Sequence, residues 1–515
     1  MKSFLTRHSQ RILGVLSGFD RVLFRGTLRS ISYVKGLETF LNANHILLKD
    51  FARFAQGCTA QLAAHAEQMA RKAGRPYRYL ESSSVRKEDI AREIAEREGI
   101  RKGLVCVLYA VEPCKTFFIY RNRATKRLDL VARQGKCRFF YFYFLDREFG
   151  LMHVRLQSWF PFEVQVCLNG RSYLARQMER AGIGFKQQGN CFTWIEDLSR
   201  AQVLLDRLNT RDWPKTLAVL AHRVNPLRKS LLHGVFDYYW TIRQSECATD
   251  VMFRDRAALH EVYPGLCQHA LTHFLSEDVM RFLGRGSGGR AATQVISSLR
   301  RGEEGVRVKH TVNENSVKMY DKAGCVLRVE TTVNNPIRFQ VLRKVSRKGK
   351  TALAWRKMRK GVSDTRRRVE VSLAANARYL DALAVIGEST PSHRILDPVS
   401  QPVQKDRYRY RGLRPVAPEE AQLFQAILHG EHLPFGFTNR QLQSCLDPQP
   451  APDRAEARRR SAWITRKLRL FRAHGLVHKV SGKRLYRISE KGHRVITTAL
   501  IFRETDFALL EAKAA

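Results

Sequence analysis

The stretch over residues 307–336 constrains the fold of this chain more than any other, because apolar and polar residues alternate there on both sides of a turn. Such a pattern is typical of a β-hairpin. A three-residue loop over 322–324, with Gly324 in the left-handed conformation, sets the register. Met319 then lies opposite Leu327, and a slip of one residue would mix the apolar and polar faces.

The second face of this hairpin gathers polar side chains, namely Ser316, Lys318, Tyr320, Arg328 and Glu330. A tyrosine, a carboxylate and cations within cross-strand reach are groups that phosphodiester chemistry uses. We interpret Tyr320 as a candidate nucleophile, with Glu330 and the neighbouring Asp321 as candidate catalytic carboxylates. The alternative is structural, because a half-buried hairpin ordinarily turns its polar face to water.

The sequence Ser-Val-Lys-Met-Tyr-Asp-Lys, followed by Leu-Arg-Val-Glu, resembles a strand pair in replication initiators of rolling-circle plasmids and phages. This resemblance covers only the hairpin. It implies cleavage of a DNA strand through a phosphotyrosyl intermediate, which preserves bond energy for rejoining. The chain contains no two histidines separated by one apolar residue, so it departs from the His-hydrophobe-His members of that group.

The charge balance restricts the class of partner. The 515 residues include 90 Lys and Arg against 48 Asp and Glu, a formal net charge of +42. This surplus favours a polyanion, and nucleic acid is the natural candidate because each neutralised phosphate releases counterions. The positive charge is spread through aromatic-rich sequence and is not gathered in one amphipathic segment, so we expect no membrane partner.

Cysteine usage and segment composition predict a soluble cytoplasmic protein. The ten cysteines are dispersed and form no Cys-x-x-Cys pair, which is typical of a reducing compartment. We find no signal-peptide core and no apolar run of transmembrane length.

Residues 77–194 are predicted to form the main sheet, since short runs of β-branched and aromatic residues alternate with turn residues. Residues 139–144 are aromatic on both faces, which indicates either a sheet buried on both sides or a face that stacks on bases. Carboxylates that lie near predicted strand ends are candidate ligands for Mg²⁺ or Mn²⁺, which prefer oxygen donors. These are Glu112, Asp146, Glu148 and Glu163.

A second unit over residues 226–387 ends in a dense run of cations with an interleaved tryptophan, Trp355. This composition favours contacts with phosphate groups over a merely solvated face. The candidate nucleic-acid-binding residues are Arg343, Lys344, Arg347, Lys348, Lys350, Arg356, Lys357, Arg359, Lys360, Arg366, Arg367 and Arg368. The proline-containing and basic stretch 388–416 that follows is predicted to be a linker.

The last part of the chain, residues 417–515, is predicted to contain two helices, a long basic helix from Arg454 to His474, a basic-tipped hairpin and a final helix. Thr438 is expected to cap the second helix. This order resembles the winged-helix domain of MarR-like transcription regulators. The resemblance implies that the basic helix enters a DNA major groove and that the hairpin tip contacts backbone or minor groove. The residues concerned are Arg458, Arg459, Arg460, Arg466, Lys467, Arg469, Lys483 and Arg484.

Together these patterns predict an α+β fold with a mixed or antiparallel sheet, flanking helices and a C-terminal winged helix. Four parts are expected, over residues 1–225, 226–387, 388–416 and 417–515. The predicted function is binding, and further processing, of nucleic acid in a mobile or phage-like element. The alternative is a regulator without catalysis, or a protein that binds structured RNA.

Overall fold

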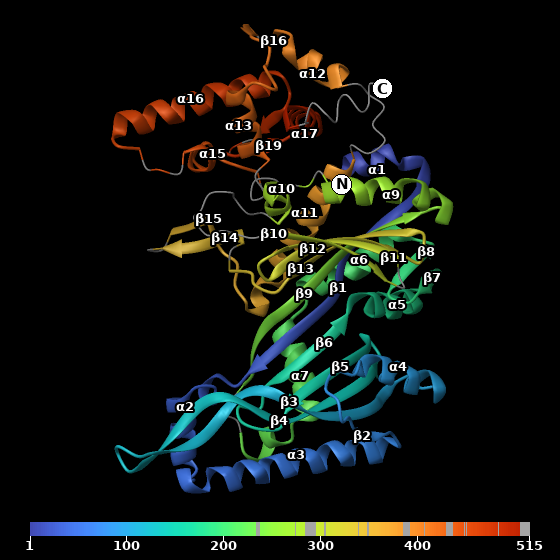
Figure 1. Cartoon of the computed structure of the whole chain (residues 1–515), viewed down its shortest axis with the longest axis vertical. Helices are drawn as coiled ribbons and strands as arrows, with labels where there is room; N and C mark the ends of the chain where they lie inside the picture. The colour runs from blue at the N-terminus through green and yellow to red at the C-terminus, as the bar shows by residue number, and fades with distance from the viewer. Residues whose placement is uncertain are drawn as a thin grey trace. The chain divides into compact units, whose positions relative to one another are not determined.

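The computed structural model shows a chain that is rich in both helix and strand (Figure 1). It describes all residues except 233–236, 273, 275, 284–294, 303–304, 338, 348–349, 385–391, 406, 429–435, 448, 450, 481, 483 and 505–515. The chain divides into two compact units. Unit 1 comprises Met1–Ser17, Cys247–Met358 and Arg367–Ala515, and unit 2 comprises Gly18–Glu246 and Arg359–Arg366. The strands β1 and β9 contribute residues to both.

Unit 2 is built on a sheet with the strand order β1-β6-β5-β4-β3-β2. Its strands are β1 (Ile12–Thr27), β2 (Tyr77–Tyr79), β3 (Gly103–Asn122), β4 (Arg127–Asp146), β5 (Gly150–Gln157) and β6 (Val164–Asn169). All neighbours are antiparallel except β2 and β3, which are parallel. A separate hairpin is formed by β7 (Phe185–Gln188) and β8 (Cys191–Ile195).

The helices of unit 2 bury the apolar positions of this sheet. They are α2 (Val34–Ala43), α3 (Phe51–Ala73), α4 (Lys87–Arg97), α5 (Gly170–Ala181), α6 (Leu198–Asp206), α7 (Trp213–Val224) and α8 (Leu227–Ser230). Trp213 of α7 packs on Phe24 and Phe149. All residues over 139–144 are buried, so both faces of the aromatic strand are covered by protein. Stacking of nucleobases on residues 139–144 is therefore not available.

Unit 1 contains the strand order β10-β11-β12-β13-β9. These strands are β9 (Tyr239–Phe253), β10 (Val295–Gly302), β11 (Gly305–Val312), β12 (Asn315–Lys322) and β13 (Val326–Val333). The helices α1 (Lys2–Arg7), α9 (Arg256–Thr272), α10 (Ser276–Phe282) and α11 (Thr365–Leu383) supply side chains to the same core as β11, β12 and β13. A basic two-stranded hairpin, β14 (Gln340–Arg347) with β15 (Lys350–Lys357), precedes α11.

The predicted hairpin is formed by β12 and β13, but its register differs from the prediction. Met319 lies opposite Val329, and Leu327 lies opposite Asp321. The reason is that the loop occupies residues 323–325, one position later than expected, with Ala323 as well as Gly324 at positive φ. Moving a loop by one residue changes the pairing by two residues, so each side chain keeps its predicted face.

The C-terminal part of unit 1 has its own core, formed by α12 (Ser392–Ser400), α13 (Pro418–Ile427), α15 (Asn439–Leu446), α16 (Arg454–Ala473) and α17 (Glu490–Glu504). A hairpin of β18 (Val477–Lys479) and β19 (Tyr486–Ile488) follows α16. This is the predicted order of elements, and Thr438 forms the capping box of α15. The stretch predicted as a linker also contains β16 (Val403–Lys405) and β17 (Tyr408–Tyr410), and its Val399 and Leu413 are buried in this core.

Candidate active site and nucleic-acid interface

The hairpin β12–β13 brings two of its predicted catalytic residues together in unit 1. The hydroxyl of Tyr320 donates a hydrogen bond to Oε2 of Glu330 at 2.7 Å, and Nζ of Lys318 lies 2.7 Å from the other oxygen, Oε1. A hydroxyl beside a carboxylate is the geometry of a nucleophile and its general base. Tyr320 is 8% exposed and Glu330 is 0% exposed. The polar face is therefore buried, contrary to the structural alternative of a water-facing surface.

A buried ion pair lies on the same face of this hairpin. Arg328 donates from Nε to Oδ1 of Asp250 at 2.5 Å and from a terminal nitrogen to Oδ2 at 2.8 Å. Both side chains are almost completely buried. A guanidinium and a carboxylate in this two-bond geometry hold each other in a fixed orientation. The pair therefore fixes β13, the strand that carries Glu330, to β9.

Asp321 does not belong to this group, because it projects from the opposite face of β12. Burial raises the pKa of its carboxyl group, while the N–H of Gly324 and the charge of Arg256 lower it. Asp321 lies near α9, whose Tyr263 and Cys267 share its surroundings. The structure thus separates Asp321 from Tyr320 and Glu330.

The four carboxylates predicted as metal ligands do not converge in unit 2. Each one has a partner of its own. Asp146 accepts backbone N–H groups of Glu148 and Phe149 in the β4–β5 turn. Glu148 pairs with Arg211, and Glu163 accepts hydrogen bonds from Arg25 and Gln165. In the described structure, cations and N–H groups occupy oxygens that a metal would need, and these four carboxylates do not form a group of possible metal ligands.

Glu112 is the most strongly engaged of these carboxylates. It accepts hydrogen bonds from the hydroxyl of Tyr141 at 2.7 Å and from Arg155 at 2.6 Å, and Nζ of Lys87 lies 3.3 Å away. Burial tends to raise the pKa of Glu112, but the hydrogen bond from Tyr141 and the charges of Arg155 and Lys87 hold it below its ordinary value. This network joins α4, β3, β4 and β5 and engages both oxygens of the carboxylate.

A different pair of carboxylates in unit 2 was not found from the sequence. Oxygens of Asp20, in β1, and Glu246, in β9, lie within 4.8 Å of each other. Asp20 is buried and accepts a hydrogen bond from Asn190, and Glu246 accepts one from Gln244. Two carboxylates at this distance are donors of the kind that Mg²⁺ or Mn²⁺ prefers. They are far apart in the sequence, so no local spacing indicates them.

The basic tract predicted to bind nucleic acid is divided by the fold. Lys344, Arg356, Lys357, Arg359, Lys360 and Arg366 are exposed, and Arg367 is half-buried. Arg343 is buried and donates to the carbonyl of Lys357, and Arg368 is fully buried and donates to the carbonyl of Val333. Buried arginines that bind backbone carbonyls support the fold. Arg347 and Lys350 lie opposite each other in the strand register at the end of the β14–β15 hairpin. Lys348 lies outside the described residues.

The six predicted cations of α16 fall into two groups. Arg459 and Arg460 form ion pairs with Glu456, and Lys467 pairs with Glu419 at 2.8 Å. The other three, Arg458, Arg466 and Arg469, are exposed and make no ion pair within the part of the chain that the structure describes. Their spacing places them on one face of the helix together with the small residues Ala462 and Thr465. This face is therefore free to approach a polyanion closely.

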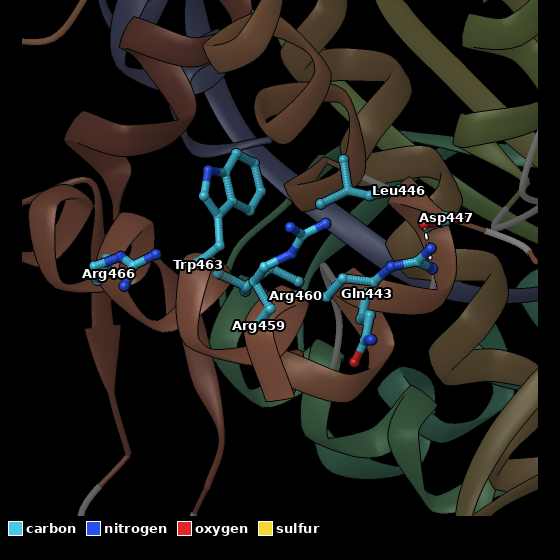
Figure 2. Close-up of a pocket in the computed structure, with 8 residues that line it drawn as sticks. Gln443, Leu446, Asp447, Arg459, Arg460, Trp463 and Arg466 are labelled. Atoms are coloured by element: carbon cyan, nitrogen blue, oxygen red, sulfur yellow. Dashed lines mark ion pairs between the residues drawn. The ribbon is translucent and has the colours of Figure 1, made fainter. Parts of the chain in front are cut away.

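A cavity of about 450 Å³ lies between α16 and α15, next to the exposed face, and Arg466 belongs to both. Leu446, Trp463 and Ile464 provide its apolar lining, and Gln443, Asp447, Arg459, Arg460 and Arg466 its polar edge. Figure 2 shows Arg460 directed toward Asp447, with which it forms an ion pair, while Arg466 extends away from the other labelled side chains. The hairpin after α16 exposes Arg484, and Lys483 lies outside the described residues.

No protein-family model, no curated protein and no solved structure matches this chain. Over the described residues, none of the helices combines the length and apolar character needed to span a bilayer.

Proposed function

We propose that this protein binds duplex DNA through the exposed arginine face of α16. The observation that carries the proposal is the separation of Arg458, Arg466 and Arg469 from the ion-paired cations of the same helix. Three guanidinium groups that form no ion pair with any described residue lie on one face, flanked by small side chains, which suits insertion of a helix into a major groove about 12 Å wide. Arg484 in the following hairpin is exposed and suits a contact with the adjacent backbone.

The test compares full-length variants for binding to a set of duplexes. Arg466→Ala with Arg469→Ala is expected to weaken binding by roughly 1–3 kcal/mol for each base contact that is lost. Arg180→Ala with Lys186→Ala is the control, because it removes two exposed cations from unit 2 and so the same net charge. Equal losses in both variants would mean that α16 contributes only its charge, and no loss in either would contradict DNA binding by this helix.

A second activity, cleavage and rejoining of a strand, is favoured by the Tyr320–Glu330 hydrogen bond. In this step Glu330 takes the phenolic proton while the tyrosine oxygen forms a bond to phosphorus. The bond from phosphorus to one deoxyribose oxygen breaks, and that oxygen leaves as a hydroxyl after it gains a proton. Because Tyr320 is only 8% exposed, the chain around it must open before a strand reaches the hydroxyl.

A divalent ion is part of this proposal only as a supplier of charge stabilisation at phosphate oxygens. In unit 2, Asp20 and Glu246 are the residues whose oxygens fit Mg²⁺ or Mn²⁺. Cleavage that requires neither ion would remove the metal from the proposal.

The experiment incubates full-length protein with supercoiled and single-stranded DNA in Mg²⁺ or Mn²⁺ and looks for a covalent adduct after denaturation. Tyr320→Phe should abolish the adduct, and Glu330→Gln should suppress it. Neither variant should change duplex binding by α16. If the wild type forms no adduct although it binds duplex DNA, the hairpin is structural and the protein is a binding protein without this activity.

A further inference from the structure

The strands β3 and β4 form a long two-stranded ribbon in unit 2. They pair with each other along their whole length, from Gly103 to Asn122 in β3. The neighbouring strand β5 pairs with β4 only from Phe139 onward, and β2 pairs with β3 only over residues 107–109. Within the described residues, 111–122 and 127–138, with the turn 123–126 that joins them, therefore form an arm that extends beyond the rest of the sheet (Figure 1).

This arm, which we call the β3–β4 arm, carries an unusual number of uncompensated cations. All its lysines and arginines are exposed, and within the described residues none of them forms an ion pair: Lys115, Arg121, Arg123, Lys126, Arg127, Arg133, Lys136 and Arg138. The arm has two acidic residues, and both are engaged, Glu112 by Tyr141 and Arg155 and Asp129 by Asn122. Crowded like charges repel one another, and a polyanion would relieve this repulsion.

The base of the β3–β4 arm is fixed to the body of unit 2. Phe117 and Leu130 are buried. Thr116 donates a hydrogen bond to the carbonyl of Phe160 at 2.6 Å, and the indole N–H of Trp159 donates to the carbonyl of Phe117 at 3.3 Å. An element held in this way loses little conformational entropy when it binds a partner.

The far end of the arm combines its cations with exposed apolar side chains. Tyr120 is 53% exposed and Leu128 is 39% exposed, and Arg121 lies opposite Leu128 in the strand register. The guanidinium of Arg133 lies over the ring of Phe118 at 4.5 Å. Interleaved aromatic and cationic groups are typical of nucleic-acid-binding surfaces.

We propose that the β3–β4 arm is a second DNA-binding element, which lies in the major groove of a duplex with its cations on the flanking phosphates. The major groove of B-form DNA admits a two-stranded ribbon, whereas the major groove of A-form RNA is too narrow for it. The arm belongs to a different unit from α16. An experiment can therefore show that the arm does not bind DNA although α16 does, or that α16 does not bind DNA although the arm does.

The test uses full-length protein and a fluorescent duplex of about 30 base pairs, long enough for several turns of groove. The variant Arg121→Ala, Arg123→Ala, Arg127→Ala, Lys136→Ala removes four exposed cations from the arm. Its matched control, Arg180→Ala, Lys186→Ala, Arg207→Ala, Lys215→Ala, removes four exposed cations elsewhere in unit 2. Binding is measured by anisotropy over a range of KCl concentrations, and thermal unfolding checks that both variants are folded.

The arm variant is expected to lower the slope of the logarithm of the binding constant against the logarithm of the salt concentration by roughly 0.9 for each phosphate contact that is lost, about 3 to 4 in all. At low salt its affinity should be weakened more than about tenfold. The control should leave the slope unchanged. Replacing Arg121, Arg123 and Arg127 by lysine instead, which keeps the charge, should restore most of the slope.

An unchanged slope in the arm variant, or an equal fall in the control, would overturn the proposal, because the arm's cations would then contribute nothing beyond net charge. Tighter binding of double-stranded RNA than of DNA, with the same sensitivity to the arm substitutions, would overturn the assignment to a major groove. A variant in which Arg466 and Arg469 are also replaced shows whether the two elements contribute independently.

Discussion

The Arg328–Asp250 pair shows what a buried charge does in unit 1. Both groups are removed from water, and each satisfies the other through two hydrogen bonds. Replacement of one partner leaves an uncompensated charge in the core. Asp250→Asn or Arg328→Met is therefore expected to lower the free energy of unfolding by about 3–5 kcal/mol.

Urea denaturation of each single variant and of the double variant measures this effect. The double variant should lose less than the sum of the two single losses, because it leaves no charge unpaired. Additive losses would mean that the two side chains do not interact as the structure shows.

His310 makes the stability of unit 1 depend on pH. Its imidazole is completely buried in β11, with the hydroxyl of Ser297 2.8 Å from Nδ1 and the hydroxyl of Tyr379 3.1 Å from Nε2. Burial lowers the pKa of His310 from 6.5 to about 4. Between these values the unfolded chain binds a proton that the folded chain does not bind, so stability falls as the pH decreases.

The free energy of unfolding is expected to fall by up to about 3 kcal/mol between pH 6.5 and pH 4 through this one group. Chemical denaturation of the wild type and of His310→Gln at several pH values isolates the contribution of His310. Burial also lowers the pKa values of His8 and His153, but these two residues titrate in both proteins. If His310→Gln kept the full pH dependence of the wild type, the loss of stability at low pH would not come from His310.

At the scale of elements, the β12–β13 hairpin shows which structural features the local sequence determines and which depend on the rest of the fold. Alternation of apolar and polar residues correctly assigned each side chain to its face, since a face depends only on the period of a strand. The loop position was wrong by one residue, because Ala323 adopts a positive φ that is uncommon for a residue with a side chain. The burial of the polar face also could not be predicted, because it depends on tertiary packing.

The predicted metal ligands illustrate the same dependence on tertiary packing. Turn carboxylates such as Glu148 were grouped because they lie near strand ends, but the structure pairs Glu148 with Arg211, on a segment distant in the sequence. Asp20 and Glu246 were missed because β1 and β9 are separated by most of unit 2. In α16, by contrast, helical spacing alone separates the face of Arg466 from the apolar face, and the prediction of an exposed basic surface needed no tertiary information.

The capping box of α15 gives an element-scale prediction. The hydroxyl of Thr438 accepts the N–H of Gln441, and the side chain of Gln441 accepts the N–H of Thr438 at 2.8 Å. Thr438→Ala removes one half of this exchange, so the midpoint of thermal unfolding should fall, with a loss of about 1 kcal/mol. Thr438→Asn, which restores an acceptor at the cap, should recover most of the loss, and an equal loss in both variants would show that the cap is not the cause.

At the scale of the whole molecule, the charge of +42 is not spread evenly over functional surfaces. Many arginines are used within the fold, as Arg328, Arg155 and Arg368 illustrate. The cations that stay exposed and unpaired in the described structure include those of the β3–β4 arm and of the outer face of α16. Net charge read from the sequence predicts the class of partner, but only the structure distinguishes cations that serve packing from cations that can reach phosphate.

This distribution predicts a steep but limited dependence of DNA binding on salt. If both elements contact phosphates, each cation that reaches the DNA backbone should add about 0.9 to the slope of the logarithm of the binding constant against the logarithm of the salt concentration. The slope should therefore correspond to roughly the number of exposed cations in the arm and on α16 that make such contacts, and not to the whole surplus charge. Titration of a duplex with full-length protein between low and moderate KCl measures the slope directly.

Substitution of the arm and of α16 together should then remove most of the slope. A slope that persists in the combined variant would place the phosphate contacts on other cations, such as those of β14 and β15. Binding that does not change with salt would exclude counterion release as the main driving force, and with it the interpretation of the charge surplus as a nucleic-acid surface.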